Sequence, residues 1–182
     1  MKGRMIKMRN FINNTKAKLS RGLSKAGFGA GVIEARTELH AKHIRNGKVI
    51  GERTVLDKVV TDDFVDDVVG ALRGVAGNYG TFDDYKFHAS GTGSGAESTD
   101  DSTLGTEVES RATGSQEAGA TTNVYKSVAT ITYTGSHAIE EHGLFNESTG
   151  GTLMDRTVFS VINVEADDAI QFTFTIQFNS GG

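Results

Sequence analysis

The C-terminal part of the chain carries a nine-residue alternation of apolar and polar side chains. It runs from residue 170 to residue 178 as Ile-Gln-Phe-Thr-Phe-Thr-Ile-Gln-Phe. Because successive side chains of a β-strand point to opposite faces, such a strand buries one face and exposes the other. The apolar face needs a second layer to pack against, which favours a layered β-structure for the body of the chain.

Other segments have the same character. Residues 32–41 and 48–60 flank Asn46-Gly47, a dipeptide typical of a two-residue hairpin turn because both positions accept a positive φ. Further strands are expected over residues 82–89, 124–134, 138–145 and 153–164. In the first of these, Tyr85, Phe87 and Ala89 are expected on one side.

One amphipathic helix is expected after the hairpin. Thr61 can cap its N-terminus, and Asp62 and Asp63 suit the positive end of the helix dipole. Its apolar residues are expected on one face, and Gly74 follows its end. These apolar residues are Phe64, Val65, Val68, Val69 and Leu72.

The segment from residue 90 to residue 122 is rich in Gly, Ser, Thr and Ala. It is too long for a featureless connection inside a compact domain. It is therefore expected to be an ordered loop around a short helix over residues 104–109, anchored by Leu104 and Val108.

These patterns predict a mainly β protein, either an antiparallel β-sandwich or a curved sheet. One or two short helices and an extended basic N-terminal arm complete the predicted fold. The arm covers residues 1–31 and the β-rich body covers residues 32–182.

Charge is divided sharply between the arm and the body. Residues 1–33 hold eight of the 19 Lys and Arg residues and none of the 23 Asp and Glu residues. The bases are Lys2, Arg4, Lys7, Arg9, Lys16, Lys18, Arg21 and Lys25. We expect these residues to bind a partner, with a protein surface favoured over nucleic-acid phosphates. Only Phe11 and Phe28 offer rings for base stacking, so sequence-specific nucleic-acid recognition is disfavoured.

Composition excludes several classes of protein. The chain has no Cys, so disulfides, thiolate metal sites and cysteine nucleophiles are excluded. No stretch approaches the roughly 18 consecutive apolar residues of a membrane span. The charged N-terminus lacks the apolar region of a signal peptide, and we therefore expect synthesis inside the cell.

Candidate sites for chemistry are weak. His137 and His142 fit neither zinc-protease motif, and on a strand they would point to opposite faces. The glycines of residues 91–95 resemble a phosphate loop, but no Lys follows and three acids do. We assign no catalytic, cofactor-binding or metal-binding residue, and an enzyme is not expected.

A series of short motifs follows one order along the body. These are Val-Val-Thr at 59–61, Gly-Thr-Gly at 91–93, Asp-Ser-Thr-Leu-Gly-Thr-Glu at 101–107, Ile-Glu-Glu-His-Gly-Leu-Phe-Asn at 139–146, Gly-Gly-Thr-Leu at 150–153 and Arg-Thr-Val-Phe at 156–159. The series resembles tailed-bacteriophage virion proteins, among them head decoration or cement proteins and collar or tail adaptors. The basic arm falls outside the resemblance, which carries over no catalytic residue.

The resemblance implies a virion protein that is made in the host cytoplasm and has no membrane partner. The favoured reading is a decoration or cement protein that binds the major capsid protein and stabilises the head through its arm. Self-association is also expected, with a trimer as one candidate state. An adaptor on a neck or tail ring is the first alternative. A glycan-binding or hydrolytic module is the second, and hydrolysis would need Glu140 or Glu141 to face another acid.

Overall fold

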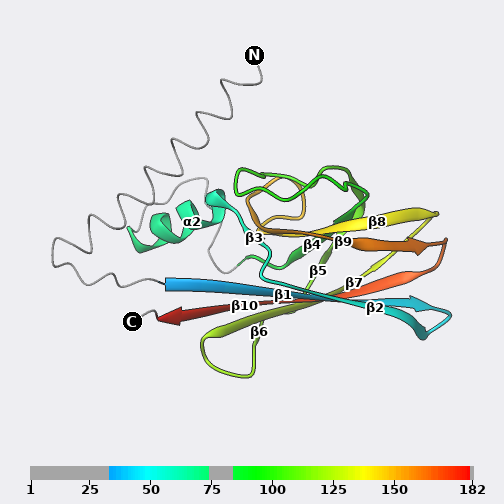
Figure 1. The fold of residues 1–182 in the computed structure, drawn as a ribbon, viewed down its shortest axis with the longest axis horizontal. Helices are drawn as coiled ribbons and strands as arrows, with labels where there is room; N and C mark the ends of the chain where they lie inside the picture. Colours follow the sequence, from blue (N-terminus) through cyan, green and yellow to red (C-terminus); the bar gives the residue numbers. More distant parts are fainter. Residues whose placement is uncertain (1–32, 74–83, 181–182) are drawn as a thin grey trace, which may run out of the picture. The chain divides into compact units, whose positions relative to one another are not determined.

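The computed structural model describes residues 33–73 and 84–180 (Figure 1). Residues 35–178 form one compact unit, and the fold and the site described below belong to it. The eight predicted partner-binding bases, Lys2 to Lys25, lie outside the described residues. The predicted boundary at residue 31 also lies outside them.

The body is mainly β, as predicted, and consists of two antiparallel sheets of five strands each. The first sheet contains, in spatial order, β2 (Lys48–Leu56), β1 (Ile33–Arg45), β10 (Ala169–Ser180), β7 (Val124–Thr132) and β6 (Glu117–Ala118). The second contains β3 (Val59–Val60), β9 (Leu153–Val164), β8 (His137–Phe145), β4 (Phe87–Gly91) and β5 (Glu107–Thr113). No helix in these described ranges is long and apolar enough to cross a bilayer.

The alternating segment forms β10, at the centre of the first sheet. Its even-numbered residues from Ile170 to Ile176 are at most 1% exposed, which confirms the predicted buried face. Opposite them on β7 lie Ile131 and Ala129, in register with Ile170 and Phe172. The main core therefore lies on the apolar face that the alternation predicted.

The predicted hairpin is confirmed as far as Leu56, whereas residues 59 and 60, predicted in the same strand, form β3 and pair with β9 of the second sheet. Strands β1 and β2 pair antiparallel and are joined by Asn46 and Gly47, with φ values of 50° and 72°. Two consecutive positive φ values define a turn whose twist matches that of the flanking strands. The Asn-Gly dipeptide thus sets the register of this pair.

Helix α2 (Asp62–Leu72) begins where predicted. Thr61 has an extended backbone, and its Oγ1 accepts a hydrogen bond from the N–H of Phe64 at 3.2 Å. The Thr61 hydroxyl also donates to the carbonyl of Leu153, which ties the start of the helix to β9. The predicted stop at Gly74 lies outside the described residues.

The apolar residues of α2 do not share one face, so that prediction was wrong. Phe64 is 2% exposed and packs edge-on against Tyr85, with ring centroids 5.2 Å apart. Asp67 faces the same way because it accepts a hydrogen bond from the Tyr85 hydroxyl. Val65, Val69 and Leu72 instead point to solvent and are 50%, 47% and 84% exposed.

Of the strand predicted over residues 82–89, residues 82 and 83 lie outside the described residues, and the prediction for the remainder was partly wrong. Strand β4 starts at Phe87, and the N–H of Lys86 donates to the carbonyl of Asp84 at 2.7 Å in a tight turn. The turn breaks the alternation between residues 85 and 87. Tyr85 therefore joins the main core, whereas Phe87 and Ala89 pack in a second apolar cluster.

The short helix predicted over residues 104–109 is absent from the described structure. Leu104 is a buried anchor, as predicted, and Val108, which belongs to strand β5, packs against the main core. Strand β5 pairs with β4, with Val108 opposite Ser90. Pairing with the edge of a neighbouring strand satisfies the backbone groups that a helix would have satisfied locally.

Candidate functional site

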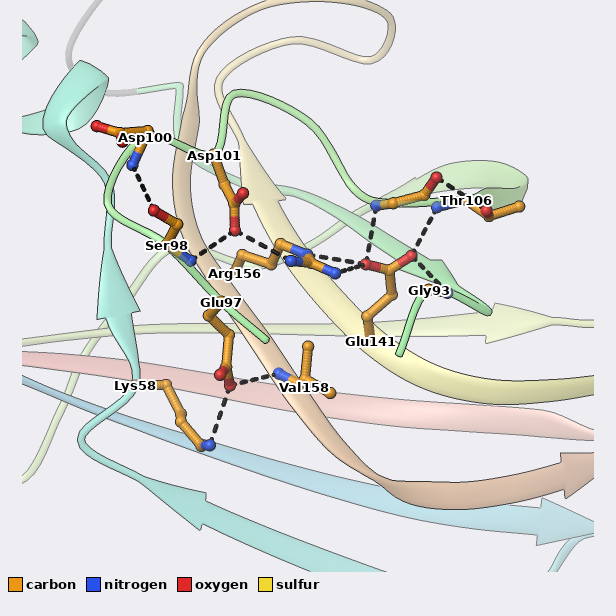
Figure 2. A network of polar contacts seen from close by, with 11 residues as sticks. Lys58, Gly93, Glu97, Ser98, Asp100, Asp101, Thr106, Glu141, Arg156 and Val158 are labelled. Carbon is orange, nitrogen blue, oxygen red and sulfur yellow. Dashed lines mark hydrogen bonds and ion pairs between the residues drawn. The ribbon is translucent and has the colours of Figure 1, made fainter. Parts of the chain in front are cut away.

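A network of charged side chains holds the loop between β4 and β5 over the second sheet, on the side away from the first sheet (Figures 1 and 2). Glu141 of β8 lies at its centre and is fully buried. Its Oε1 accepts hydrogen bonds from the N–H groups of Gly93 and Thr106, both at 2.8 Å. Its Oε2 accepts from the N–H of Gly105 and from Arg156 Nε, both at 2.9 Å.

Arg156 of β9 joins Glu141 to a second carboxylate. Its Nη2 lies 2.8 Å from Glu141 Oε2, and its Nη1 donates to Asp101 Oδ2 at 3.0 Å. The same Asp101 oxygen accepts from the N–H of Ser98 at 2.9 Å. Figure 2 shows the guanidinium of Arg156 between the two carboxylates, in contact with both. Glu141 therefore holds both ends of the loop, and Arg156 adds a contact to its interior through Asp101.

Glu141 stays ionised although it is buried, because hydrogen-bond donors surround its carboxylate. Burial opposes its ionisation, but the N–H groups of Thr106 and Gly105, the Arg156 guanidinium and the N–H of Gly93 together hold the pKa of Glu141 below its usual value. A carboxylate with this many donors remains an acceptor and is poorly placed to take up a proton. The geometry is that of an anchor for a loop.

A third carboxylate fixes the middle of the loop. Glu97 Oε1 accepts from the N–H of Val158 on β9 at 2.9 Å and lies 3.0 Å from Lys58 Nζ. Burial opposes ionisation of Glu97, but these two donors keep its pKa below the usual value. Lys58 follows β2, so the Glu97 contact also joins the loop to the segment between the two sheets.

The glycines of this loop make room for the anchor. A Cβ on Gly91 would lie 2.3 Å from the carbonyl oxygen of Thr106, and one on Gly93 would lie 2.5 Å from Glu141 Oε1. Real Cβ contacts are never this short, so neither position has space for a side chain. The Gly-Thr-Gly motif at 91–93 resembled a phosphate loop in sequence. In the structure, its Gly93 N–H donates to a carboxylate of the same chain.

A different polar cluster lies between the two sheets. His88 Nδ1 is 2.9 Å from His142 Nε2, and His88 Nε2 is 2.8 Å from the hydroxyl of Ser127 on β7. All three side chains are fully buried. Burial lowers the pKa of His88 to about 3 and holds the pKa of His142 well below its usual value. Both imidazoles are therefore neutral at physiological pH.

Asp155 of β9 is also buried, on the side of the second sheet that faces the first sheet. Its Oδ1 accepts from the Thr157 hydroxyl at 2.7 Å, and no donor among the described residues reaches its Oδ2. Burial is the main reason that the pKa of Asp155 rises to about 7, with a further contribution from Glu97. Asp155 therefore differs from Glu141, which lies on a neighbouring strand and is equally buried.

The residues singled out by sequence are separated in the structure. His137 lies at the start of β8, with its Nε2 3.6 Å from Glu109 Oε1, and it is partly exposed, unlike His142. No group of three His, Asp or Glu side chains suited to a metal ion occurs within residues 33–73 and 84–180. Arg156 lies between Glu141 and Asp101, the second carboxylate of the network.

Sequence reasoning missed the network itself. Its only local signal is the pair of acidic residues, Glu140 and Glu141, within the predicted strand over residues 138–145. Comparisons with protein families, with curated proteins and with solved structures found no match. Function is therefore inferred from the residues of this chain alone.

Proposed function

We propose that this protein is a structural component of a tailed-phage virion and acts as a decoration or cement protein on the outer capsid surface. The virion assignment is supported by the resemblance of the motif series over residues 59–159, and the observation that carries the mode of attachment is the division of charge. A segment with eight bases and no acid precedes a body that holds every Asp and Glu residue of the chain. Such a segment binds acidic surfaces strongly, while the body keeps its own fold.

The contacts inside the body support a structural role. Glu141, Arg156 and Glu97 use their charges to bind backbone groups and each other. Their donors and acceptors come from loops and strands far apart in the sequence, so the network stiffens the surface over the second sheet. A stiff body suits a protein that adds contacts to a larger assembly.

In this proposal the basic residues of positions 1–31 bind the major capsid protein of the host particle. Many copies on one capsid would repeat the contact, which compensates for the roughly 1–2 kcal/mol of backbone entropy lost for each residue that becomes ordered. Self-association into an oligomer, such as a trimer at a lattice site, belongs to the same proposal.

The first test is the number of copies per purified virion, measured by quantitative mass spectrometry against the major capsid protein. A ratio near one copy per capsid subunit, or one trimer per lattice site, supports decoration. About a dozen copies per particle would instead indicate a ring at the neck or tail and would overturn the decoration proposal. Absence from the particle would overturn the virion proposal as a whole.

The second test concerns the bases. Lys2, Lys7, Lys16 and Lys18 are changed together to Gln in one variant and to Arg in a matched control that keeps the charge. Occupancy of purified particles should fall in the Gln variant and remain in the Arg variant, because attachment depends on positive charge. Equal occupancy of both variants would contradict a role of these charges in attachment.

A further inference from the structure

Helix α2 presents an apolar stripe that residues 33–73 and 84–180 leave exposed. Val65, Val69 and Leu72 are spaced four and three residues apart, which places them in one row along the helix. They are 50%, 47% and 84% exposed. The opposite side of the helix already packs on the core through Phe64, so the row is a second apolar surface and is not needed for the fold.

Acidic residues flank this stripe. Asp62 and Asp66 are one helical turn apart and lie beside Val65 and Val69, and Asp63 is also exposed. None of these three carboxylates has an ion-pair partner within residues 33–73 and 84–180. No basic residue lies in the last turn of the helix. The surface is therefore apolar along its centre and negative along its side.

The composition of this surface indicates what can bind to it. Two copies of α2 packed against each other would bring like net charges together, which disfavours a second α2 as the occupant. A better occupant has bases along its length and apolar residues among them. Residues 1–31 fit this description, with eight bases, no acid and the apolar residues Ile6, Phe11, Ile12, Leu19 and Leu23.

We propose that the α2 stripe is a docking site for the basic N-terminal segment, residues 1–31, of a neighbouring copy of the chain. This inference rests on the proposed function, in which that segment reaches beyond its own body to the major capsid protein, and it assigns part of the segment to α2 of a neighbouring copy. Apolar residues of the segment cover Val65, Val69 and Leu72, and its bases face Asp62 and Asp66. Each copy then receives one segment and donates one, which links neighbours on the capsid surface.

The experiment uses the full chain, mixed from unlabelled and ¹⁵N-labelled protein. A carbodiimide joins carboxylates directly to Lys ammonium groups that touch them, and mass spectrometry identifies the joined peptides. We expect links between Lys residues of positions 1–31 and Asp62, Asp63 or Asp66, including links between a labelled and an unlabelled chain. An absence of such links would overturn the proposal, and links found only within single chains would also overturn it.

A matched pair of variants separates docking from general surface effects. Leu72→Ser removes the most exposed apolar side chain of the stripe, and Leu56→Ser changes a comparably apolar residue of β2 that is 58% exposed. The yield of mixed-label links should fall about tenfold or more with Leu72→Ser, because burying a Leu side chain contributes about 1.5–3 kcal/mol. It should not change with Leu56→Ser. Equal yields for the two variants would overturn the assignment of the site.

Failure of this inference can be told apart from failure of the proposed function. If Leu72→Ser abolishes self-association and no Lys to Asp links form, a second α2 helix is the occupant and the docking proposal is wrong. The number of copies per virion is measured separately and does not depend on the cross-links. A normal copy number without cross-links would overturn the docking site and leave the proposed function intact.

Discussion

The two faces of the second sheet both bury polar side chains, but they hold them in opposite charge states. On the face that carries the β4–β5 loop, Glu141 and Arg156 stay charged because each is surrounded by partners. On the face toward the first sheet, His88 and His142 are neutral, and Asp155 has an oxygen without a partner among the described residues. The side chains that face the first sheet are more strongly desolvated and have fewer partners, and both differences decide which charges persist.

The largest expected loss of stability comes from removing Arg156 from its network with Glu141 and Asp101. Arg156→Ala leaves Glu141 and Asp101 without their shared cation, and removing one partner of a buried pair costs about 3–5 kcal/mol. The free energy of unfolding, measured in urea at pH 7, should fall by that amount. Arg53→Ala serves as the control, because Arg53 bonds Ser160 at an exposed position and should cost less than about 1 kcal/mol. Similar losses for the two variants would show that the outer network contributes no more than a surface contact.

The next prediction concerns Asp155, on the side of the second sheet that faces the first sheet, and the dependence of folding stability on pH. The pKa of Asp155 is about 7 in the folded chain and about 3.8 as a free group. The unfolded chain therefore loses this proton first, and Asp155 destabilises the fold progressively as pH rises from about 4 to 7. Asp155→Asn removes this dependence.

In unfolding titrations, the stability of Asp155→Asn relative to the unchanged chain should improve by up to about 4 kcal/mol between pH 3 and pH 8. The difference should then stay constant above pH 8, where both states have lost the proton. A difference that is the same at pH 3 and pH 8 would mean that the carboxyl finds a partner or reaches water in the folded chain.

A smaller effect measures how closely the loop fits its anchor. Gly93→Ala forces a Cβ against the Glu141 carboxylate and should lower the free energy of unfolding by about 1–3 kcal/mol. Gly95→Ala is the matched control, two residues away, where a Cβ meets nothing within 4 Å. Thermal unfolding of the two variants gives the comparison. If Gly93→Ala is as stable as Gly95→Ala, the loop moves freely with respect to Glu141.

The smallest effect concerns the hydrogen bond that the inner cluster makes across the core. Ser127→Ala removes the hydroxyl beside His88 Nε2, and a neutral hydrogen bond contributes about 1 kcal/mol. Urea unfolding should show a loss of that size, with Ser148→Ala as an exposed Ser control. A loss as large as that of Arg156→Ala would contradict the ranking of the charged side above the neutral side.

Local signals in the sequence predicted most strands and the start of the helix. Strand β9 has the predicted bounds, 153–164, and Thr61 caps α2 as expected. The errors occur where a contact with a distant segment decided the outcome. The hydrogen bond from Tyr85 to Asp67 set which face of α2 is buried. Residues 107–113 form a strand because they pair with the edge of β4.

The candidate site was beyond sequence reasoning for the same reason. Glu141 reaches Gly93 across 48 residues and Thr106 across 35, and no periodicity within a strand encodes such a pairing. The glycines at 91 and 93 were visible, but the sequence could not tell that the carboxylate against them belongs to this chain.

The sequence by itself determined the β-rich body, the Asn-Gly turn, the helix cap and the split of charge between residues 1–33 and the remainder. These depend on alternation, on local backbone preferences and on composition, all of which are properties of neighbouring residues. Only the tertiary structure decided which buried groups are charged. The charge of Glu141 or Asp155 depends on the donors that folding brings within about 3 Å, and those donors come from other strands and loops.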